Sequence, residues 1–332
     1  MLHRAFWCIA VARHSQDRKA LAGQKDPTAC HGSALPGCAT LAESEALCRG
    51  VARHYENFTV ATRLVPRRLR QHLTNVYAFA RWSDDLADES PSPSEAARGL
   101  AHWRQHLESC FAGNPTHPVF IALAETVRQT GLTIKPFSDL LSAFEEDQAF
   151  DQDQIRVRYA TRTALLDYCH RSADPVGQIV LALEGCHDPE LISMSDAICT
   201  GLQLVNFWQD VKRDRLAGRV YLPRDDMDRF GIEETALDAS RASPDLIRLL
   251  REEVAWAGEC FDAGSPLVKR APLVLQPAIR MFLAGGRAVA SCVERAGFDT
   301  LSVRPMVSTW TKLRLAAAAW CEITTAPWRS RV

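Results

Sequence analysis

Two pairs of aspartates, each spaced four residues apart inside an apolar, helix-forming segment, constrain this chain more than any other feature. The first pair is Asp84 and Asp88, and the second is Asp210 and Asp214. On a helix each pair places two like charges on one face, which destabilises an isolated helix. The neighbouring residues are mostly Tyr, Phe, Trp, Leu and Val, and buried carboxylates without partners are costly. The pattern therefore predicts two helices whose carboxylates face a shared, cation-binding site.

One such pair alone most often lies on a solvent-exposed helix face and has no function. Here the companions on each stripe favour a site: Tyr77 and Arg81 precede the first pair, and Gln203 and Asn206 precede the second. Carboxylate oxygens suit Mg²⁺, which fills its other coordination positions with water and substrate phosphate. The arrangement predicts a diphosphate held by metal ions between two helices, with Arg81 neutralising the same oxygens.

The composition is that of a globular protein with a sizeable core. The 332 residues are 47% hydrophobic and 24% charged, and the formal net charge of -1 argues against a general nucleic-acid surface. The 11 cysteines show no paired spacing and indicate reduced, mostly buried thiols of a cytosolic protein. No apolar run approaches the roughly 18 residues of a membrane span, so an integral membrane protein is not expected.

Helical patterns separated by turn residues cover most of the chain, and regularly spaced strands are not found, which predicts an all-α fold. Pro66 is expected to open the helix of the first cluster, and Gly218 to end that of the second. Gly285 and Gly286 are expected to let two helices approach closely. The predicted helices are 42–52, 66–89, 95–111, 117–129, 137–150, 162–184, 191–216, 244–262, 273–295 and 305–324.

Three segments together resemble the squalene/phytoene synthase family. They are His54-Tyr-Glu-Asn-Phe58, Tyr77-Ala-Phe-Ala-Arg81-x-x-Asp84-Asp85-x-x-Asp88, and Gln203-x-x-Asn206-x-x-x-Asp210-x-x-x-Asp214 followed by Arg219-Val-Tyr221-Leu-Pro. Within the family, the first two segments are most similar to the bacterial hydroxysqualene synthases of hopanoid pathways. The resemblance covers about residues 54–295. It implies a single-domain class I isoprenoid (terpenoid) synthase fold, a helical bundle around a central apolar cavity.

The resemblance also assigns residues to roles. It implies two to three Mg²⁺ ions that bridge the diphosphate and are held by Asp84, Asp88, Asp210, Asp214 and Asn206. Substrate binding would fall to His54, Arg81, Gln203 and Asn206, and Arg81 would also take part in catalysis. Tyr77 and Tyr168 would lie near the reacting carbons, where a tyrosine ring stabilises a carbocation and its hydroxyl moves a proton.

The implied activity is the conversion of presqualene diphosphate and water to hydroxysqualene and diphosphate, without NADPH. One alternative is a head-to-head synthase that condenses two farnesyl or geranylgeranyl diphosphates to presqualene diphosphate, squalene or phytoene. A second alternative is a non-catalytic helical pathway partner. Lys212-Arg213 stands where many relatives have an acidic residue, and Tyr55 where a serine often stands. Both departures favour an enzyme of the second step alone.

Residues 1–40 are rich in Gly, Pro, Ser and charge and are expected to form a poorly ordered extension. A squalene/phytoene synthase catalytic domain (41–300) and a C-terminal helix and tail (301–332) are expected to follow. The resemblance implies a prenyl diphosphate substrate and, as pathway partners, a presqualene diphosphate synthase and a squalene-forming flavin enzyme. A cytoplasmic location, peripheral to the inner membrane, is expected. The apolar stretch 310–328 fits either a membrane surface or packing against the body of the protein, and we favour packing.

Overall fold

The computed structural model describes residues 39–53 and 65–325, and in these ranges the protein is helical and contains no strand. An isolated parallel bridge joins Val157 and Val220. The all-α prediction is confirmed. The helices are α2 (Leu41–Arg53), α4 (Arg67–Asp88), α5 (Pro93–Phe111), α6 (Pro118–Thr130), α7 (Lys135–Gln152), α8 (Arg162–Ser172), α9 (Asp174–Leu183), α10 (Pro189–Gln209), α11 (Val211–Leu216), α12 (Arg224–Arg229), the 3₁₀ turn η3 (Glu234–Asp238), α13 (Pro244–Gly264), α14 (Leu267–Arg270), α15 (Gln276–Arg295) and α16 (Thr309–Thr325).

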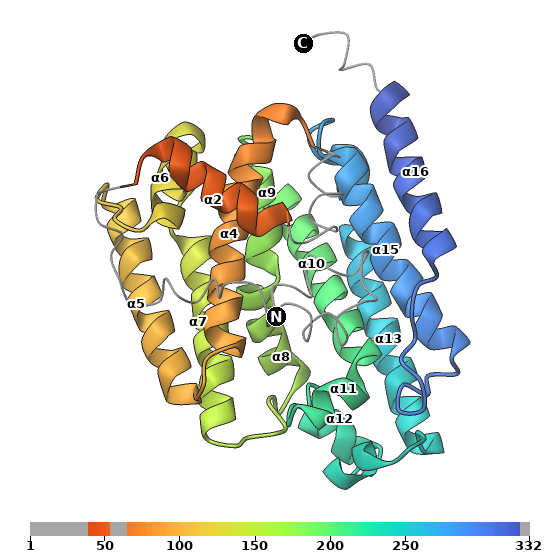
Figure 1. Ribbon diagram of the computed structural model, residues 1–332. Helices are drawn as coiled ribbons and strands as arrows, with labels where there is room; N and C mark the ends of the chain where they lie inside the picture. The colour runs from red at the N-terminus through yellow and green to blue at the C-terminus, as the bar shows by residue number, and fades with distance from the viewer. Residues whose placement is uncertain (1–38, 54–64, 326–332) are drawn as a thin grey trace.

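The helices form a bundle in which the two aspartate-bearing segments come from opposite sides. In Figure 1, α4, α5, α6 and α7 lie on one side and α10, α13, α15 and α16 on the other, with α8 and α9 between them. Contacts of α9 with α4, α7 and α10, and of α8 with α7 and α10, join the two sides. The short helices α11 and α12 lie at the lower end of this view.

The helix of the first cluster begins and ends where the sequence predicts. Pro66 stands just before α4 with φ -54° and ψ 148°, and the helix ends at Asp88, before the Ser90-Pro91 sequence. A proline fits the start of a helix because its missing N–H has no intrahelical partner there. Gly218, with φ +76°, ends α11 in the left-handed conformation that glycine adopts without strain.

Two helices predicted as continuous are each divided, and those boundaries were wrong. The stretch 162–184 breaks between α8 and α9, where Pro175 lacks an N–H and Ala173 leaves helical geometry. The stretch 191–216 breaks at Asp210, whose N–H is shared between the carbonyls of Asn206 and Phe207 at 3.0 and 3.2 Å. The N–H of Asp214 still donates to the Asp210 carbonyl at 2.8 Å, so the second pair stays one turn apart.

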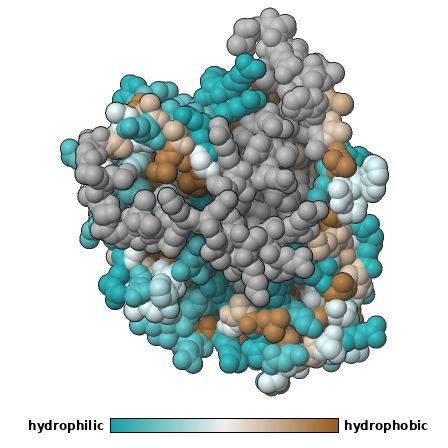
Figure 2. Space-filling model, viewed as in Figure 1, coloured by the Kyte–Doolittle hydropathy of each residue, from teal (hydrophilic) through white to brown (hydrophobic). Residues whose placement is uncertain are grey.

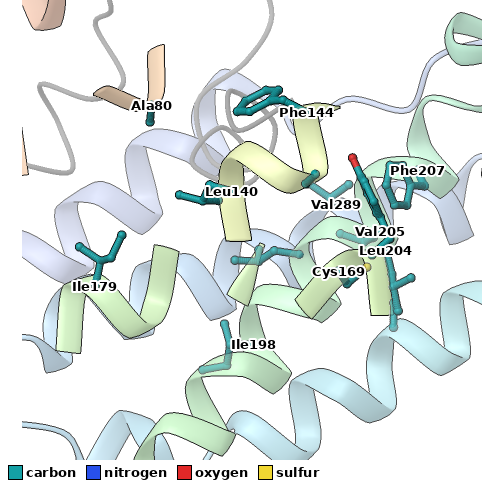
Figure 3. Close-up of a cluster of buried hydrophobic side chains, with 14 of the residues drawn as sticks. Ala80, Leu140, Phe144, Cys169, Ile179, Ile198, Leu204, Val205, Phe207 and Val289 are labelled. Atoms are coloured by element: carbon teal, nitrogen blue, oxygen red, sulfur yellow. The ribbon is translucent and has the colours of Figure 1, made fainter. Parts of the chain in front are cut away.

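The core is contributed by both sides of the bundle. Figure 3 shows buried side chains from α4, α7, α8, α9, α10 and α15 directed into one interior, including Ala80, Leu140, Cys169, Ile198 and Val289. On the face shown in Figure 2, apolar residues of the described chain appear as small scattered groups among polar ones. The aspartates of the site therefore belong to segments that border this apolar interior.

Close packing of α10, α13 and α15 depends on glycines around Phe261. A Cβ atom added at Gly286 would lie 2.5 Å from the ring of Phe261, and one at Gly201 would lie 2.8 Å from it. Both distances are too short for real contacts, so only glycine lets the ring occupy this junction. The predicted close approach at Gly286 is confirmed.

The C-terminal helix α16 lies along α15 (Figure 1), as the packing alternative predicts. Trp310 and Leu313 of α16 nevertheless remain exposed. Within the described ranges no helix is both long and apolar enough to cross a membrane. The predicted extension 1–40 falls almost wholly outside the described residues, as do His54 and Tyr55.

Phe261→Ala is expected to lower the free energy of unfolding by about 3–5 kcal/mol, because a fully buried ring would leave a cavity among three helices. Urea denaturation followed by circular dichroism measures the change. Trp310→Ala, at a side chain that is 82% exposed, serves as the control and should stay within about 0.5 kcal/mol of the parent. A loss below about 1 kcal/mol for Phe261→Ala would contradict a tightly packed junction.

Candidate active site

The first aspartate pair is asymmetric, because one carboxylate is buried and the other is not. Asp84 is 4% exposed, whereas the side chain of Asp88, at the end of α4, is 46% exposed. Arg81 pairs with Asp84 at 2.9 Å and also contacts Asp85 and, at 3.4 Å, Glu89. The guanidinium predicted to neutralise a diphosphate thus neutralises the acidic residues of its own helix in this structure.

Arg219 brings the end of the first cluster next to the end of the second. Its guanidinium lies 3.7 Å from Asp88 and 2.6 Å from Asp151 of α7, while its backbone N–H donates to the Asp214 carbonyl at 2.8 Å. A single residue therefore contacts both predicted metal-binding segments. Arg219 thus links the end of α4 to the end of the second aspartate-bearing segment, although Asp88 and Asp214 lie 126 residues apart in the sequence.

The second pair is buried and is neutralised from the C-terminal part of the chain. Asp210 and Asp214 are 3% and 2% exposed. Arg304, in the segment between α15 and α16, donates from Nε and a terminal nitrogen to the two oxygens of Asp210, at 2.5 and 3.2 Å. Arg213 lies 3.9 Å from the same carboxylate. This two-point pairing is the geometry in which a guanidinium holds a carboxylate most firmly.

Gln203 and Asn206 lie on α10 above this pair, as their spacing predicts, and both are buried. Gln203 has no exposed surface, and both its amide oxygen and nitrogen lack a hydrogen-bond partner within the described ranges. A buried amide in this condition costs free energy until it meets a polar partner. The side chain is therefore a candidate for contact with a bound molecule.

Tyr168 is fully buried on α8, and its hydroxyl donates to Asp147 of α7 at 3.0 Å. Burial raises the pKa of Asp147 to about 7, even though Arg219 and Arg158 lie close enough to lower it. Arg158 also donates to the Asp147 carbonyl at 3.1 Å and contacts Asp151. A carboxyl group with a pKa near neutrality can either release or accept a proton at physiological pH.

Aromatic rings surround Tyr168. The rings of Tyr159, Tyr221 and Phe207 have centroids 5.2, 6.4 and 6.4 Å from that of Tyr168, and Phe207 stacks on Tyr221 at 4.0 Å. Aromatic faces attract cations through the ring quadrupole. A small pocket beside this group is lined by Phe207, Trp208, Val211, Asp214, Arg219, Val220, Tyr221, Leu222 and Leu237. The pocket thus touches both the aromatic group and the second aspartate pair.

Tyr77, the other predicted tyrosine, lies on α4 one turn before Arg81 and is 5% exposed. No contact that we describe places it beside Tyr168, so the predicted meeting of the two tyrosines at the reacting carbons stays a prediction. The predicted role of His54 in diphosphate binding concerns a residue outside the described ranges.

The donor set suits Mg²⁺ in its chemistry, because it consists of hard carboxylate oxygens, which belong to the buried Asp84, Asp210 and Asp214 and to the exposed Asp88. Within the described ranges, however, no three His, Cys, Asp or Glu side chains converge on one point. Guanidinium groups balance Asp84, Asp88 and Asp210 instead. The residues therefore fit a cation, and metal binding at Asp210 requires Arg304 to yield its place.

Sequence reasoning missed Asp147, Tyr159 and Arg304. Asp147 stands seven residues after Leu140 and three after Phe144, at a position of α7 where the apolar stripe predicts a hydrophobic residue. A charged residue that interrupts an apolar stripe in this way is a signal that can be read from the sequence. No such signal marks Arg304, because its pairing with Asp210 joins residues 94 apart in the sequence.

A sequence model of the squalene/phytoene synthase family matches residues 51–311. A phytoene synthase of Arthrospira platensis is 32% identical over 83% of this chain and 92% of its own length. A hydroxysqualene synthase of Zymomonas mobilis is 35% identical over 59% of this chain and 63% of its own length.

Solved structures agree with these matches. Squalene synthase HpnC from Alicyclobacillus acidocaldarius has a TM-score of 0.72 and 39% identity, covering 78% of this chain and 95% of that one. A dehydrosqualene synthase in complex with ligand has a TM-score of 0.74 at 24% identity, covering 86% of this chain and 98% of that one, and supports the fold.

Asp147→Asn is expected to remove a pH-dependent loss of stability. Because the folded-state pKa is raised from 3.8 to about 7, the folded protein holds this proton more tightly than the unfolded chain, and stability falls as the pH rises from about 4 to 7. Between pH 5 and pH 8 the free energy of unfolding of the parent should fall by about 1–3 kcal/mol more than that of the variant. Urea denaturation at both pH values measures this, and parallel pH profiles would contradict the shifted pKa.

Proposed function

This chain belongs to the squalene/phytoene synthase family, and from that membership we propose that it converts presqualene diphosphate and water to hydroxysqualene and diphosphate. It is an enzyme of the isoprenoid synthase fold. The observation that carries the specific proposal is the 39% identity to squalene synthase HpnC over 78% of the chain. Hydroxysqualene synthases of three bacteria, at 31 to 35% identity, support it.

The diphosphate would bind between the two aspartate pairs, at the end of the bundle where Arg219 contacts both segments. We assign Mg²⁺ to Asp84, Asp88, Asp210 and Asp214 with Asn206, and bound Mg²⁺ would neutralise the diphosphate as it leaves. Arg81 and Arg219 lie among the same carboxylates and could turn to the phosphate oxygens once metal relieves them. His54 is proposed as a further diphosphate contact, and Gln203 as a polar contact in the substrate wall.

Departure of the diphosphate leaves an allylic or cyclopropylcarbinyl cation, which the aromatic group would stabilise. Phe207 and Tyr221 line the pocket, the ring of Tyr168 lies beside both, and we place Tyr77 at the same substrate. The surrounding apolar core would restrict water to a single productive position. This arrangement places the departing diphosphate anion and the carbocation in different parts of the site.

Quenching by water must also dispose of one proton. We propose that water forms its C–O bond while one of its protons passes to the Tyr168 hydroxyl oxygen. The proton already on that hydroxyl would pass to Oδ2 of Asp147, 3.0 Å away. A carboxyl pKa of about 7 suits Asp147 to this step, because it is partly ionised at neutral pH. No nicotinamide is needed in this scheme, since water rather than hydride ends the reaction.

The head-to-head synthase remains the second candidate, because the Arthrospira platensis phytoene synthase aligns over a larger share of this chain than the hydroxysqualene synthase of Zymomonas mobilis does. Arg213 and Arg304 near Asp210 weigh against it, since they leave less negative charge for the metals of a second diphosphate. Family membership sets aside the non-catalytic alternative. Under our proposal, separate enzymes would supply presqualene diphosphate and reduce hydroxysqualene to squalene, and the protein would work in the cytoplasm, at the inner membrane.

Purified protein with Mg²⁺ should convert presqualene diphosphate to hydroxysqualene without NADPH, as detected by lipid chromatography and mass spectrometry. Asp84→Asn and Asp210→Asn should each lower turnover by at least about 100-fold, since each removes a ligand charge from the diphosphate site. Asp299→Asn, away from the site, provides a matched control. Efficient consumption of farnesyl diphosphate alone would favour the second candidate, and near-normal activity of either site variant would refute the metal assignment.

Arg304→Gln is expected to strengthen Mg²⁺ binding, because the guanidinium no longer competes for Asp210. The measurement is the rise in thermal midpoint on adding Mg²⁺, which should be several degrees larger in the variant than in the parent. Arg241→Gln, which removes a single-contact pair with Asp299 at 3.3 Å, is the control. An equal or smaller rise in Arg304→Gln would show that the ion does not bind at Asp210.

A further inference from the structure

The surface of α5 carries two histidines that belong to no part of the candidate active site. His102 and His106 lie one turn apart, and their Nε2 atoms face each other at 3.1 Å. Their rings are 4.5 Å apart between centroids and inclined by 71°. His102 is exposed and His106 half-buried, so the two nitrogens meet where solvent has access.

The separation of the two nitrogens matches a chelate. An ion bound at about 2.0–2.1 Å from each nitrogen, with the nitrogens 3.1 Å apart, would have an N–metal–N angle of about 95–102°. That range lies between the 90° of square-planar or octahedral coordination and the tetrahedral angle, so it fits either geometry. Imidazole nitrogens suit Ni²⁺ and Cu²⁺, which stand at the high-affinity end of the divalent first-row series, whereas Mg²⁺ prefers oxygen.

Neighbouring groups hold the His106 ring in place. Its Nδ1 lies 3.4 Å from the Thr116 hydroxyl, which can accept the Nδ1 proton and leave the Nε2 lone pair directed at His102. The rings of Trp103 and His117 pack against it, with centroids 6.2 and 5.6 Å away. Burial lowers the pKa of His106, which keeps the ring neutral and able to bind a metal.

We propose that His102 and His106 form a two-ligand site for a late divalent transition-metal ion, of which Ni²⁺ and Cu²⁺ are the best fits. The ion takes the place of the proton shared between the nitrogens, while His102 moves its own proton from Nε2 to Nδ1. Water fills the remaining positions, because no cluster of three or more candidate ligands lies in the described part of the chain. The site is chemically distinct from the oxygen-rich diphosphate site and does not compete with it for Mg²⁺.

The test is a titration of the full chain with Ni²⁺, which does not oxidise its cysteines, in saturating Mg²⁺. Isothermal calorimetry counts the ions, and quenching of tryptophan fluorescence reports an ion beside Trp103. The informative variant moves a histidine instead of removing it. It combines His102→Gln with Gln105→His, so the chain still contains ten histidines. Residues 105 and 106 point about 100° apart on a helix and cannot hold one ion together. His187→Gln, at an exposed histidine in the loop before α10, is the control.

The parent and His187→Gln should each bind one Ni²⁺ ion that the double variant does not bind. A second variant, His106→Gln, should lose at least tenfold in affinity for that ion. Circular dichroism should show the same helical content in all four proteins, since residues 102 and 105 are exposed. Equal uptake and equal quenching in the parent and the double variant would overturn the proposal, because they would place the ion on other histidines or cysteines.

Discussion

The pairing of the site's carboxylates with arginines is the interaction on which this structure depends. An isolated charge taken out of water costs several kcal/mol, and only a well-placed partner with further hydrogen bonds offsets that cost. Arg304 supplies such a partner to Asp210, and Arg81 supplies one to Asp84 within α4, while Arg219 contacts the exposed Asp88. Because Arg219 and Arg304 come from outside the helices they neutralise, these pairs also fix how the ends of the bundle meet.

The same arrangement separates two kinds of chemistry within one interior. Oxygen and guanidinium groups gather at the end of the bundle where Arg219 reaches Asp88, which suits a polyanionic leaving group. Aromatic rings gather around Tyr168, which suits the cation left behind. The Tyr168–Asp147 hydrogen bond lies where the two regions adjoin. This junction fits the proposed reaction, in which the diphosphate must separate from the carbocation before water quenches the carbocation.

The sequence predicts the fold class well because helical periodicity and proline or glycine punctuation are local signals. It predicts the boundaries less well, since the break at Asp210 follows from hydrogen bonding that no spacing rule contains. The aspartate pairs could be found because each carries its pattern within one segment. Arg304 could not, because its partner lies 94 residues earlier. Asp147 falls between these cases: its polar side chain interrupts an apolar stripe, but only the fold reveals Tyr168 as its partner.

The pairing of Arg304 with Asp210 has a consequence for how the protein is made in a cell. Because a guanidinium already balances the buried carboxylate, the polypeptide can reach its native arrangement during synthesis without waiting for an ion. Metal scarcity would then lower output from the pathway while leaving the amount of folded polypeptide unchanged. Under the proposed function, supply of the ion would adjust flux without burdening the chaperones and proteases that remove unfolded chains.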